Sequence, residues 1–473
     1  MDVHIDLARR GDRTSQIYRQ LLDAILDGRL RSGERLPATR DLAQQLAVSR
    51  TTVALAYDRL TADGFLVSRV GAGTFVCTER LRPTQHRTAP SDAGVRPRPL
   101  WQSLTPPSDA PSSGSEFDFR VGIPDASLFP LQTWRRLVSR ELRPALTQST
   151  YADPRGHEGF RQAIARHWGT ARAVRASADD VLVTQGAQQA FDLIGRVLLE
   201  PGDRVAIEEP GYPAVRELFR SHGARVVGVP VDDEGLDVTQ LPSDTRVVYV
   251  TPSHQFPLGT VLSLRRRTAL LSWAERHDAV IIEDDYDSEF RFSDRPLRPL
   301  QSLDRSGRVI YVGSFSKTML PMLRLGFLVA PASLHAALTS AKELVDSSGP
   351  PTLQGAMSTF VDDGLLARHV RKAGRIYAAR RDQVVQTLQT DFAAWLEPVP
   401  SSAGLHVCAR VRPAADLDVF QLLDRARAVG VAVHSLARYC MRQPQQGLVL
   451  GYGAIETDRI GPGLERLRTL IDG

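Results

Sequence analysis

The sequence predicts two domains of different fold class, a small α+β domain followed by a large α/β domain, and three observations support this. The 473 residues are too many for one ordinary hydrophobic core. Residues 1–79 carry three helix signals and then a hairpin signal, whereas strand-like runs alternate with helical stretches across residues 116–473. Residues 80–115 are rich in Pro, Ser, Thr, Ala and Arg without an apolar period, which is typical of a flexible linker.

The helices of the small domain are predicted from apolar residues at helical spacing. These residues are Ile17, Leu21, Ile25 and Leu26 in the first helix, and Leu42 and Leu46 in the second. A third helix begins at the N-cap Ser49, with Val48 and Val53 at the two positions of a hydrophobic staple.

A hairpin follows these helices. Asp63-Gly64 ends the third helix, and two short strand-like runs lie between Phe65 and Val76 around the turn-rich Gly71-Ala72-Gly73. Three helices and a hairpin in this order describe a winged helix-turn-helix. Its third helix follows the tight turn at Ala47-Val48 and would be the element that reads DNA.

The first turn of that third helix carries Arg50, Thr51 and Thr52, whose side chains and free N–H groups can face phosphates and base edges. Arg40 is placed to reach the DNA backbone. Arginines and acidic residues are nearly balanced in this domain, so the DNA signal is local. The alternative is a small protein-interaction module in which Arg50 lies on a solvated face.

The residues themselves favour DNA binding. The domain reads Leu36-Pro37-x-x-Arg40-x-Leu42-Ala43-x-x-Leu46-x-Val48-Ser49-Arg50-x-Thr52-Val53, and later Gly71-x-Gly73-Thr74-Phe75-Val76. This pattern resembles the DNA-binding domain of GntR-type regulators. The resemblance implies a bacterial transcription regulator, with DNA contacts from Arg40, Ser49, Arg50, Thr51, Thr52 and the wing around Gly71.

Six apolar runs predict the strands of the large domain: Val181–Thr184, Arg204–Ile207, Val247–Val250, Val280–Ile282, Val309–Val312 and Phe327–Val329. Helical stretches lie between several of them. The pattern predicts a mostly parallel sheet with helices on both faces, whose ligand lies at the carboxyl ends of the strands.

Composition limits the class of protein and its partners. The net charge of +5 and the pI of about 9.3 permit an anionic partner without requiring one. Three cysteines without metal-ligand spacing predict reduced thiols in a cytoplasmic protein and no metal site. Neither a signal peptide nor a run of about 20 apolar residues is present, so we expect no membrane association.

Lysine usage directs attention to one residue. Only three of the 59 basic residues are lysines: Lys317, Lys342 and Lys372. Arginine stays protonated and cannot act as an amine nucleophile, whereas a lysine can form a Schiff base with the aldehyde of pyridoxal 5'-phosphate. We interpret Lys342 and Lys372 as surface residues and Lys317 as the candidate cofactor anchor.

The ends of the predicted strands could supply the other parts of such a site. Gly186, Ala187 and Gln188 open a helix after a strand, where backbone N–H groups can bind a phosphate. Tyr212 could stack on a pyridine ring, and His254 or Gln255 could bond its oxygen. Each has a plainer alternative: a structural strand-to-helix turn, a tyrosine packed over the core, or an ordinary loop histidine.

Acidic and basic residues complete the set. Asp284 follows an apolar strand, where a carboxylate beside a pyridine nitrogen would keep it protonated. Tyr286 could bond the ring oxygen, and Ser314 and Arg324 could bind the phosphate. The alternative for the stretch around Asp284 is a solvated acidic loop.

In this order the stretches resemble the fold type I aminotransferases across roughly residues 117–470. The resemblance implies Lys317 as the Schiff-base lysine, Asp284 on the pyridine nitrogen, Tyr286 on the ring oxygen and Tyr212 as the stacking ring. It also implies that Tyr151 reaches the phosphate of a partner subunit in a head-to-tail homodimer. Arg438 falls where these proteins place the arginine that grips a substrate carboxylate.

The two halves together resemble the MocR subfamily of GntR-type regulators, which Glu283-Asp-Asp-Tyr-Asp-Ser-Glu-Phe-Arg291 matches in particular. The resemblance implies a regulator that binds a double-stranded DNA operator and senses pyridoxal phosphate or an amino compound through an aldimine at Lys317. Members that respond to 4-aminobutyrate use a second arginine where this chain has Ala214, which argues against that effector. Two alternatives are a true aminotransferase with a fused DNA-binding domain and a repressor whose large domain is only a scaffold.

Overall fold

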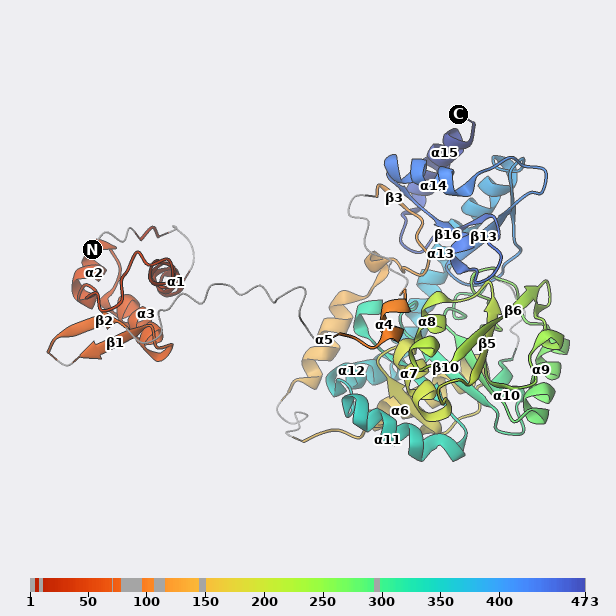
Figure 1. Ribbon diagram of the computed structural model, residues 1–473, viewed down its shortest axis with the longest axis horizontal. Coiled ribbons are helices and arrows are strands. Elements are labelled where there is room, and N and C mark those ends of the chain that lie inside the picture. The colour runs from red at the N-terminus through yellow and green to blue at the C-terminus, as the bar shows by residue number, and fades with distance from the viewer. Residues whose placement is uncertain are drawn as a thin grey trace. The chain divides into compact units, whose positions relative to one another are not determined.

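The computed structural model describes residues 5–7, 12–69, 71–77, 96–105, 115–143, 150–292 and 298–472. The chain divides into two compact units, Met1–Arg96 and Pro97–Gly473, and each is treated by itself (Figure 1). Most of the expected linker, residues 80–115, lies outside the described residues, so its extent remains a prediction. Within its described part, Pro99–Ser103 forms the short helix α4.

The small unit contains the three predicted helices and the predicted hairpin. Their bounds are α1 Arg13–Leu26, α2 Thr39–Gln45, α3 Arg50–Ala62, β1 Leu66–Arg69 and β2 Gly73–Val76. Ile17, Leu21 and Ile25 are buried on one face of α1. Leu26 is 57% exposed and does not belong to that face, because one further residue turns the helix by about 100°.

Local interactions fix the turn between α2 and α3. The Ser49 hydroxyl accepts a hydrogen bond from the Thr52 N–H at 3.1 Å, so Ser49 is the N-cap of α3. Val48 packs half-buried against the core that contains the buried Val53, as a hydrophobic staple requires. Ala47 has a φ of 51°, which turns the chain sharply between the two helices.

An eight-stranded sheet forms the centre of the large unit. Its strand order is β4 Val181–Thr184, β11 Gly326–Val329, β10 Val309–Ser314, β9 Val280–Asp285, β8 Thr245–Val250, β5 Arg204–Glu209, β6 Arg225–Asp232 and β7 Gly235–Leu236. All six predicted strands are present, and β6 and β7 were not predicted. The sheet is mixed, because β11 runs antiparallel to both of its neighbours and β7 runs antiparallel to β6, whereas the other neighbouring strands are parallel.

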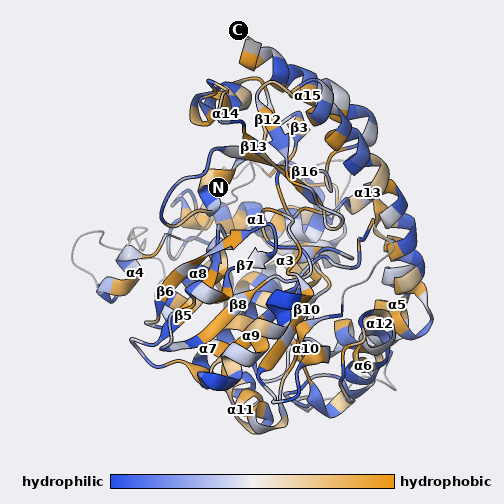
Figure 2. Cartoon of the chain, turned by 90° about the vertical axis from the view of Figure 1, so that its right-hand side faces the viewer, coloured by the Kyte–Doolittle hydropathy of each residue, from blue (hydrophilic) through white to orange (hydrophobic). Residues whose placement is uncertain are grey.

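Alternation along the strands sorts their side chains onto two helix-covered faces. Val247 and Tyr249 of β8 join one core cluster, whereas Val248 and Val250 join another. Helices α7 Ala187–Leu198, α8 Pro213–Ser221 and α11 His335–Asp346 cover the first face, and α9 Leu264–Arg276 and α10 Leu300–Leu303 cover the second. Strands β5 and β8 are coloured mainly hydrophobic in Figure 2, as expected for a sheet buried on both faces.

Three further helices extend the core beside β4, β10 and β11: α5 Leu131–Glu141, α6 Glu158–Arg172 and α12 Pro351–Asp362. No described helix is long and apolar enough to cross a lipid bilayer. Cys77, Cys408 and Cys440 are free thiols.

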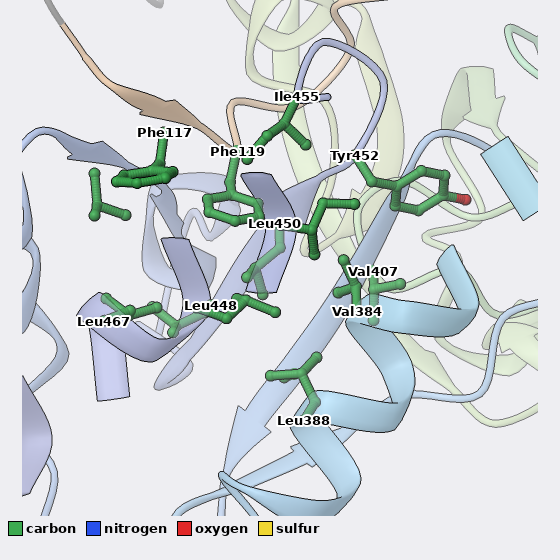
Figure 3. Packing of buried hydrophobic residues seen from close by; sticks show 14 of the residues in the cluster. Phe117, Phe119, Val384, Leu388, Val407, Leu448, Leu450, Tyr452, Ile455 and Leu467 are labelled. Atoms are coloured by element: carbon green, nitrogen blue, oxygen red, sulfur yellow. The ribbon is translucent and has the colours of Figure 1, made fainter. Parts of the chain in front are cut away.

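The C-terminal part of the large unit has its own sheet and core, which the sequence did not reveal. Its elements are α13 Leu365–Thr390, β12 Leu396–Pro398, β13 His406–Val411, α14 Val419–Ala428, β14 Val431–Ala432, β15 His434–Ser435, β16 Gly447–Gly451 and α15 Thr457–Asp472. The short strand β3 Phe117–Asp118 pairs with β14, and Phe117 and Phe119 pack in the same core as Leu448 and Leu450 (Figure 3). A segment near residue 117 is therefore packed in the same core as the C-terminal strands.

Candidate functional site

A cavity of about 380 Å³ lies at the carboxyl ends of β8, β9 and β10 in the large unit. This is the position that the predicted sheet assigned to a ligand. Many of the predicted site residues line the cavity: Lys317, Asp284, Tyr286, Tyr212, Ala187, Gln188, Ser314, Arg324 and Arg438. The topology thus brings together side chains that are spread over 252 positions of the sequence, from Ala187 to Arg438 counted inclusively.

Lys317 projects into this cavity from the segment after β10. Its Nζ donates a hydrogen bond to the carbonyl oxygen of Gly122 at 2.6 Å. A Cβ atom at position 122 would lie only 2.9 Å from the same Nζ, and Gly122 has a φ of +81°, so both the space and the backbone favour glycine. The amine is therefore held at a defined position.

Asp284 presents a buried carboxylate to the cavity. Its Oδ2 accepts a hydrogen bond from the Tyr249 hydroxyl at 2.6 Å, whereas its Oδ1 is buried without a hydrogen-bond partner. Burial raises the pKa of Asp284 to about 7. An N–H donor or a cation at Oδ1 would relieve this cost, which is the interaction that a protonated pyridine nitrogen provides.

An anion cradle lies at the start of α7. Gly186 is the N-cap, with a φ of 79°, and the first turn exposes the backbone at Ala187 and Gln188 to the cavity. The Arg324 guanidinium donates to the Gln185 carbonyl at 2.7 Å and lies 3.2 Å from the position that a Cβ on Gly186 would take. A helix N-terminus beside a guanidinium suits a phosphate, so the residues present fit pyridoxal phosphate.

Aromatic side chains form another wall. Tyr212 and Phe256 pack edge to face with their ring centroids 5.6 Å apart, and both line the cavity with Tyr286. His254 does not line it. Its ring stacks against Tyr286, with Nδ1 2.9 Å from the Tyr286 hydroxyl oxygen, and it also contacts the lining residues Asp287 and His406.

Of the residues predicted to contact an effector or a partner subunit, Arg438 lies at the cavity and Tyr151 does not. Arg438 is exposed at the cavity in a 3₁₀ turn, Leu436–Tyr439. Ala214 also lines the cavity, whereas Arg216 donates to Glu217 at 3.0 Å. Tyr151 is 92% exposed and is not among the lining residues, so its expected contact with a partner subunit remains a prediction.

The sequence interpretation missed several cavity residues, most of them in segments outside the predicted motifs, although Asp287 and Tyr439 directly follow the predicted Tyr286 and Arg438. The missed residues are Val121, Gly122, Ile123, Tyr249, Phe256, Asp287, His406, His434 and Tyr439. Tyr249 lies in a predicted strand, but nothing local distinguishes it from a core tyrosine. Burial and the neighbouring His254 place the pKa of His406 well below its usual range, so this ring is neutral at neutral pH.

Lys342 contradicts its interpretation as a surface residue. It is 1% exposed and forms an ion pair with Asp346, one helical turn further along α11. Asp346 also accepts hydrogen bonds from the side chains of Gln185 at 2.6 Å and Gln189 at 2.8 Å. The buried pair therefore joins α11 to the turn that carries the anion cradle.

The small unit presents the predicted DNA-binding residues on its surface. Arg40, Arg50 and Thr51 are exposed, and Gly71 lies exposed at the hairpin turn with a φ of 75°. Ser49 and Thr52 bond each other through their hydroxyls at 2.8 Å, so both also stabilise the start of α3. The exposed arginines and the first turn of α3 suit the phosphates and base edges of DNA.

Comparisons with known proteins agree with both units. Residues 13–76 match the gntR family of bacterial regulatory proteins, and residues 118–443 match aminotransferase class I and II. The probable rhizopine catabolism regulatory protein MocR of Rhizobium meliloti is 38% identical over 466 residues, covering 96% of this chain and 92% of that protein. The pyridoxine biosynthesis transcriptional regulator PdxR of Corynebacterium glutamicum is 32% identical, covering 94% of this chain and 93% of the regulator.

Solved structures match the large unit. A kynurenine aminotransferase of Pyrococcus horikoshii superimposes with a TM-score of 0.70 at 28% sequence identity. The match covers 76% of this chain and 91% of that enzyme. The large unit therefore has the fold type I aminotransferase fold that the sequence predicted.

Proposed function

This chain belongs to the MocR-type regulators, in which a gntR-family domain precedes an aminotransferase class I and II domain, and on that premise we propose how it acts. It is a transcription regulator that binds a specific double-stranded DNA operator through the small unit. It binds pyridoxal 5'-phosphate in the large unit and senses either that cofactor or an amino compound. It acts in the cytoplasm as a head-to-tail homodimer.

The observation that carries the cofactor proposal is the combination of Lys317 and Asp284 in one cavity. The amine is held beside Gly122, and the carboxylate has one buried oxygen without a partner. When bound, pyridoxal phosphate supplies an aldehyde that condenses reversibly with amines and a pyridine ring that withdraws electrons. A site that served only as a scaffold would have no need of this buried, unpaired oxygen.

Several residues of the cavity have defined tasks in this proposal. Arg324, Ser314 and the N-terminus of α7 bind the phosphate. Asp284 holds a proton on the pyridine nitrogen, and the Tyr249 hydroxyl orients the carboxylate through its 2.6 Å hydrogen bond. The fourth task belongs to Lys317, whose Nζ is the amine that an incoming amino compound would displace.

The cavity also limits the effector. Of the described residues that line it, only two are arginines, Arg324 at the anion cradle and Arg438 on the C-terminal side. Arg438 suits a single carboxylate. The position of the second arginine is held by Ala214, which supports effectors other than 4-aminobutyrate. The printed name of PdxR refers to pyridoxine biosynthesis, which supports pyridoxal phosphate as one candidate effector.

The experiment compares wild type with Lys317→Ala. Purified wild type should turn yellow with pyridoxal phosphate and bind a specific DNA site with an affinity that changes when the cofactor is added. Lys317→Ala should stay colourless and bind the same site with an affinity that the cofactor leaves unchanged. A wild type that stays colourless at saturating cofactor would refute the cofactor proposal.

A true aminotransferase is the second candidate, because Lys317, Asp284, Arg324 and Arg438 would also serve catalysis. The two functions differ in turnover. We expect at most a single half-reaction per site with an amino acid. Sustained transfer of the amino group to a keto acid, over many cycles per site, would favour the enzyme.

A further inference from the structure

A buried group of polar side chains lies directly behind the wall of the cavity. His254 and Asp287 are both about 2% exposed, and Nδ1 of the histidine lies 3.1 Å from each carboxylate oxygen. The same Nδ1 lies 2.9 Å from the Tyr286 hydroxyl oxygen. Nε2 lies 3.0 Å from the Ser401 hydroxyl, so both ring nitrogens have protein partners.

The Asp287 carboxylate determines that Nδ1 of His254 carries a proton. An unprotonated Nδ1 would direct its lone pair at both oxygens of Asp287, which is repulsive, whereas an N–H at Nδ1 can donate to them. The same N–H can then be shared with the Tyr286 oxygen, which leaves the hydroxyl proton of Tyr286 for the cavity. This holds whether His254 is neutral or charged, because both forms carry the Nδ1 proton.

The position of the histidine ring is fixed by its surroundings. A Cβ atom on Gly404 would lie 2.1 Å from Cε1 of His254 and 2.5 Å from Oδ2 of Asp287, and Gly404 has a φ of +87°. The neighbouring ring of His406, 4.9 Å away between centroids, is neutral because its pKa is lowered. Besides Asp287 itself, the charged groups that line the adjoining cavity are Lys317, Asp284, Arg324 and Arg438.

We propose that Asp287 and His254 are positioning residues that turn the Tyr286 hydroxyl into a hydrogen-bond donor toward the cavity. Tyr286 then donates to the ring oxygen of bound pyridoxal phosphate, and His254 acts on the cofactor only through it. The three residues do not form a metal site, although ligand atoms of His254, Asp287 and His406 lie within 4.8 Å of one another. Their nitrogens already bond Tyr286, Ser401 and the Pro257 carbonyl.

This inference rests on the proposed cofactor binding, and its test is the pH midpoint of the visible absorbance of protein loaded with pyridoxal phosphate. Asp287→Asn lets an amide N–H face Nδ1, which moves the proton to Nε2 and turns the Tyr286 hydroxyl toward His254. The cofactor's ring oxygen then keeps more negative charge and holds a neighbouring proton more tightly. We expect the midpoint to rise by roughly one pH unit, the size of one lost hydrogen bond to a charged oxygen.

A double-mutant cycle separates this role from a purely structural one. Tyr286→Phe should raise the midpoint by a similar amount, and the double variant should rise no further than Tyr286→Phe alone. Ser401→Ala, which removes the Nε2 partner and a hydrogen bond to the Ala403 carbonyl but leaves Nδ1 facing Asp287, should leave the midpoint unchanged. If Asp287→Asn does not fold, Asp287→Ala also removes the carboxylate that holds the Nδ1 proton and should raise the midpoint in the same direction.

The outcomes distinguish the two proposals. Absence of any visible band in loaded wild type refutes the proposed function and this inference together. A normal band in wild type with an unchanged midpoint in Asp287→Asn overturns the inference alone. Shifts of Asp287→Asn and Tyr286→Phe that simply add would also overturn it, because the two residues would then act independently.

Discussion

At the residue scale, Asp284 links stability to cofactor binding. Its pKa rises from 3.8 to about 7 on folding, because the side chain is buried. Below about pH 4 both the folded and the unfolded chain hold the proton. As the pH rises toward 7 the unfolded chain loses the proton first, so the cofactor-free protein loses stability in that window.

Asp284→Asn should remove this pH-dependent loss. The amide oxygen can still accept from the Tyr249 hydroxyl, but the side chain never ionises. In the absence of cofactor we expect the variant to be more stable than wild type above pH 7, by on the order of 2–4 kcal/mol, and equal to it below about pH 4. Thermal unfolding across this pH range measures the difference.

The stability advantage of Asp284→Asn over wild type should become smaller when pyridoxal phosphate is present. Asparagine cannot form a charge-assisted hydrogen bond with a protonated ring nitrogen, so we expect at least about tenfold weaker cofactor binding. A variant with wild-type affinity would show that Asp284 does not contact the ring nitrogen.

Individual residues also show which parts of the site could be predicted from the sequence and which could not. Lys317 was found through the rarity of lysine in this sequence, and Asp284 and Tyr286 were found because they follow a predicted strand, whose end lies at the ligand-binding edge of the sheet. Gly122 and His406 belong to segments whose position depends on the complete topology, so no local pattern could reveal them. Lys342 was misjudged because composition says nothing about burial.

At the scale of elements, apolar runs identified six strands of the large sheet correctly. Strand β6 was missed because several of its residues are exposed or half-buried and it contains Pro230, which weakens the apolar signal. Three strands of the C-terminal part are short, with three residues in β12 and two in each of β14 and β15. Such strands form through tertiary packing, as the core around Phe117 and Leu448 illustrates, and single-chain patterns do not specify them.

The contact between α11 and the start of α7 gives a prediction for these elements. Lys342→Met leaves Asp346 without its buried cation, so we expect a loss of roughly 3 kcal/mol of stability. Lys372→Met is the matched control, because Lys372 is exposed on α13 and should change stability by less than about 0.5 kcal/mol. Thermal unfolding of both variants tests this, and equal effects would show that the ion pair does not stabilise the cradle.

Helix α3 gives a second prediction at this scale. Arg50 is exposed in its first turn, and Arg50→Ala should weaken binding to a specific DNA site by about 1–3 kcal/mol if the side chain reads a base. Arg29→Ala is the control, because Arg29 is equally exposed but follows α1 and pairs with Asp27. Titration of labelled DNA at one fixed salt concentration compares the two, since both remove one positive charge. Equal losses would show that Arg50 contributes charge alone.

At the scale of the whole molecule, the two units have separate cores, so a signal between them must be a difference in free energy between states of the full chain. The packing within either core does not by itself determine this difference in free energy. An effector changes DNA binding only if it binds the DNA-bound and DNA-free protein with unequal affinity.

Thermodynamic reciprocity turns this requirement into a prediction. If pyridoxal phosphate changes the DNA affinity of the full-length protein by some factor, the specific DNA must change the cofactor affinity by the same factor. We expect a factor of about 5–150, corresponding to a coupling of about 1–3 kcal/mol. Titrating the cofactor with and without the DNA site measures the change in cofactor affinity. Titrating the DNA with and without cofactor measures the change in DNA affinity. Asp284→Asn weakens cofactor binding without touching the small unit, so it should shift the cofactor titrations while leaving cofactor-free DNA binding unchanged. Cofactor and DNA that bind independently would show that pyridoxal phosphate itself is not the signal by which the large unit regulates the small one.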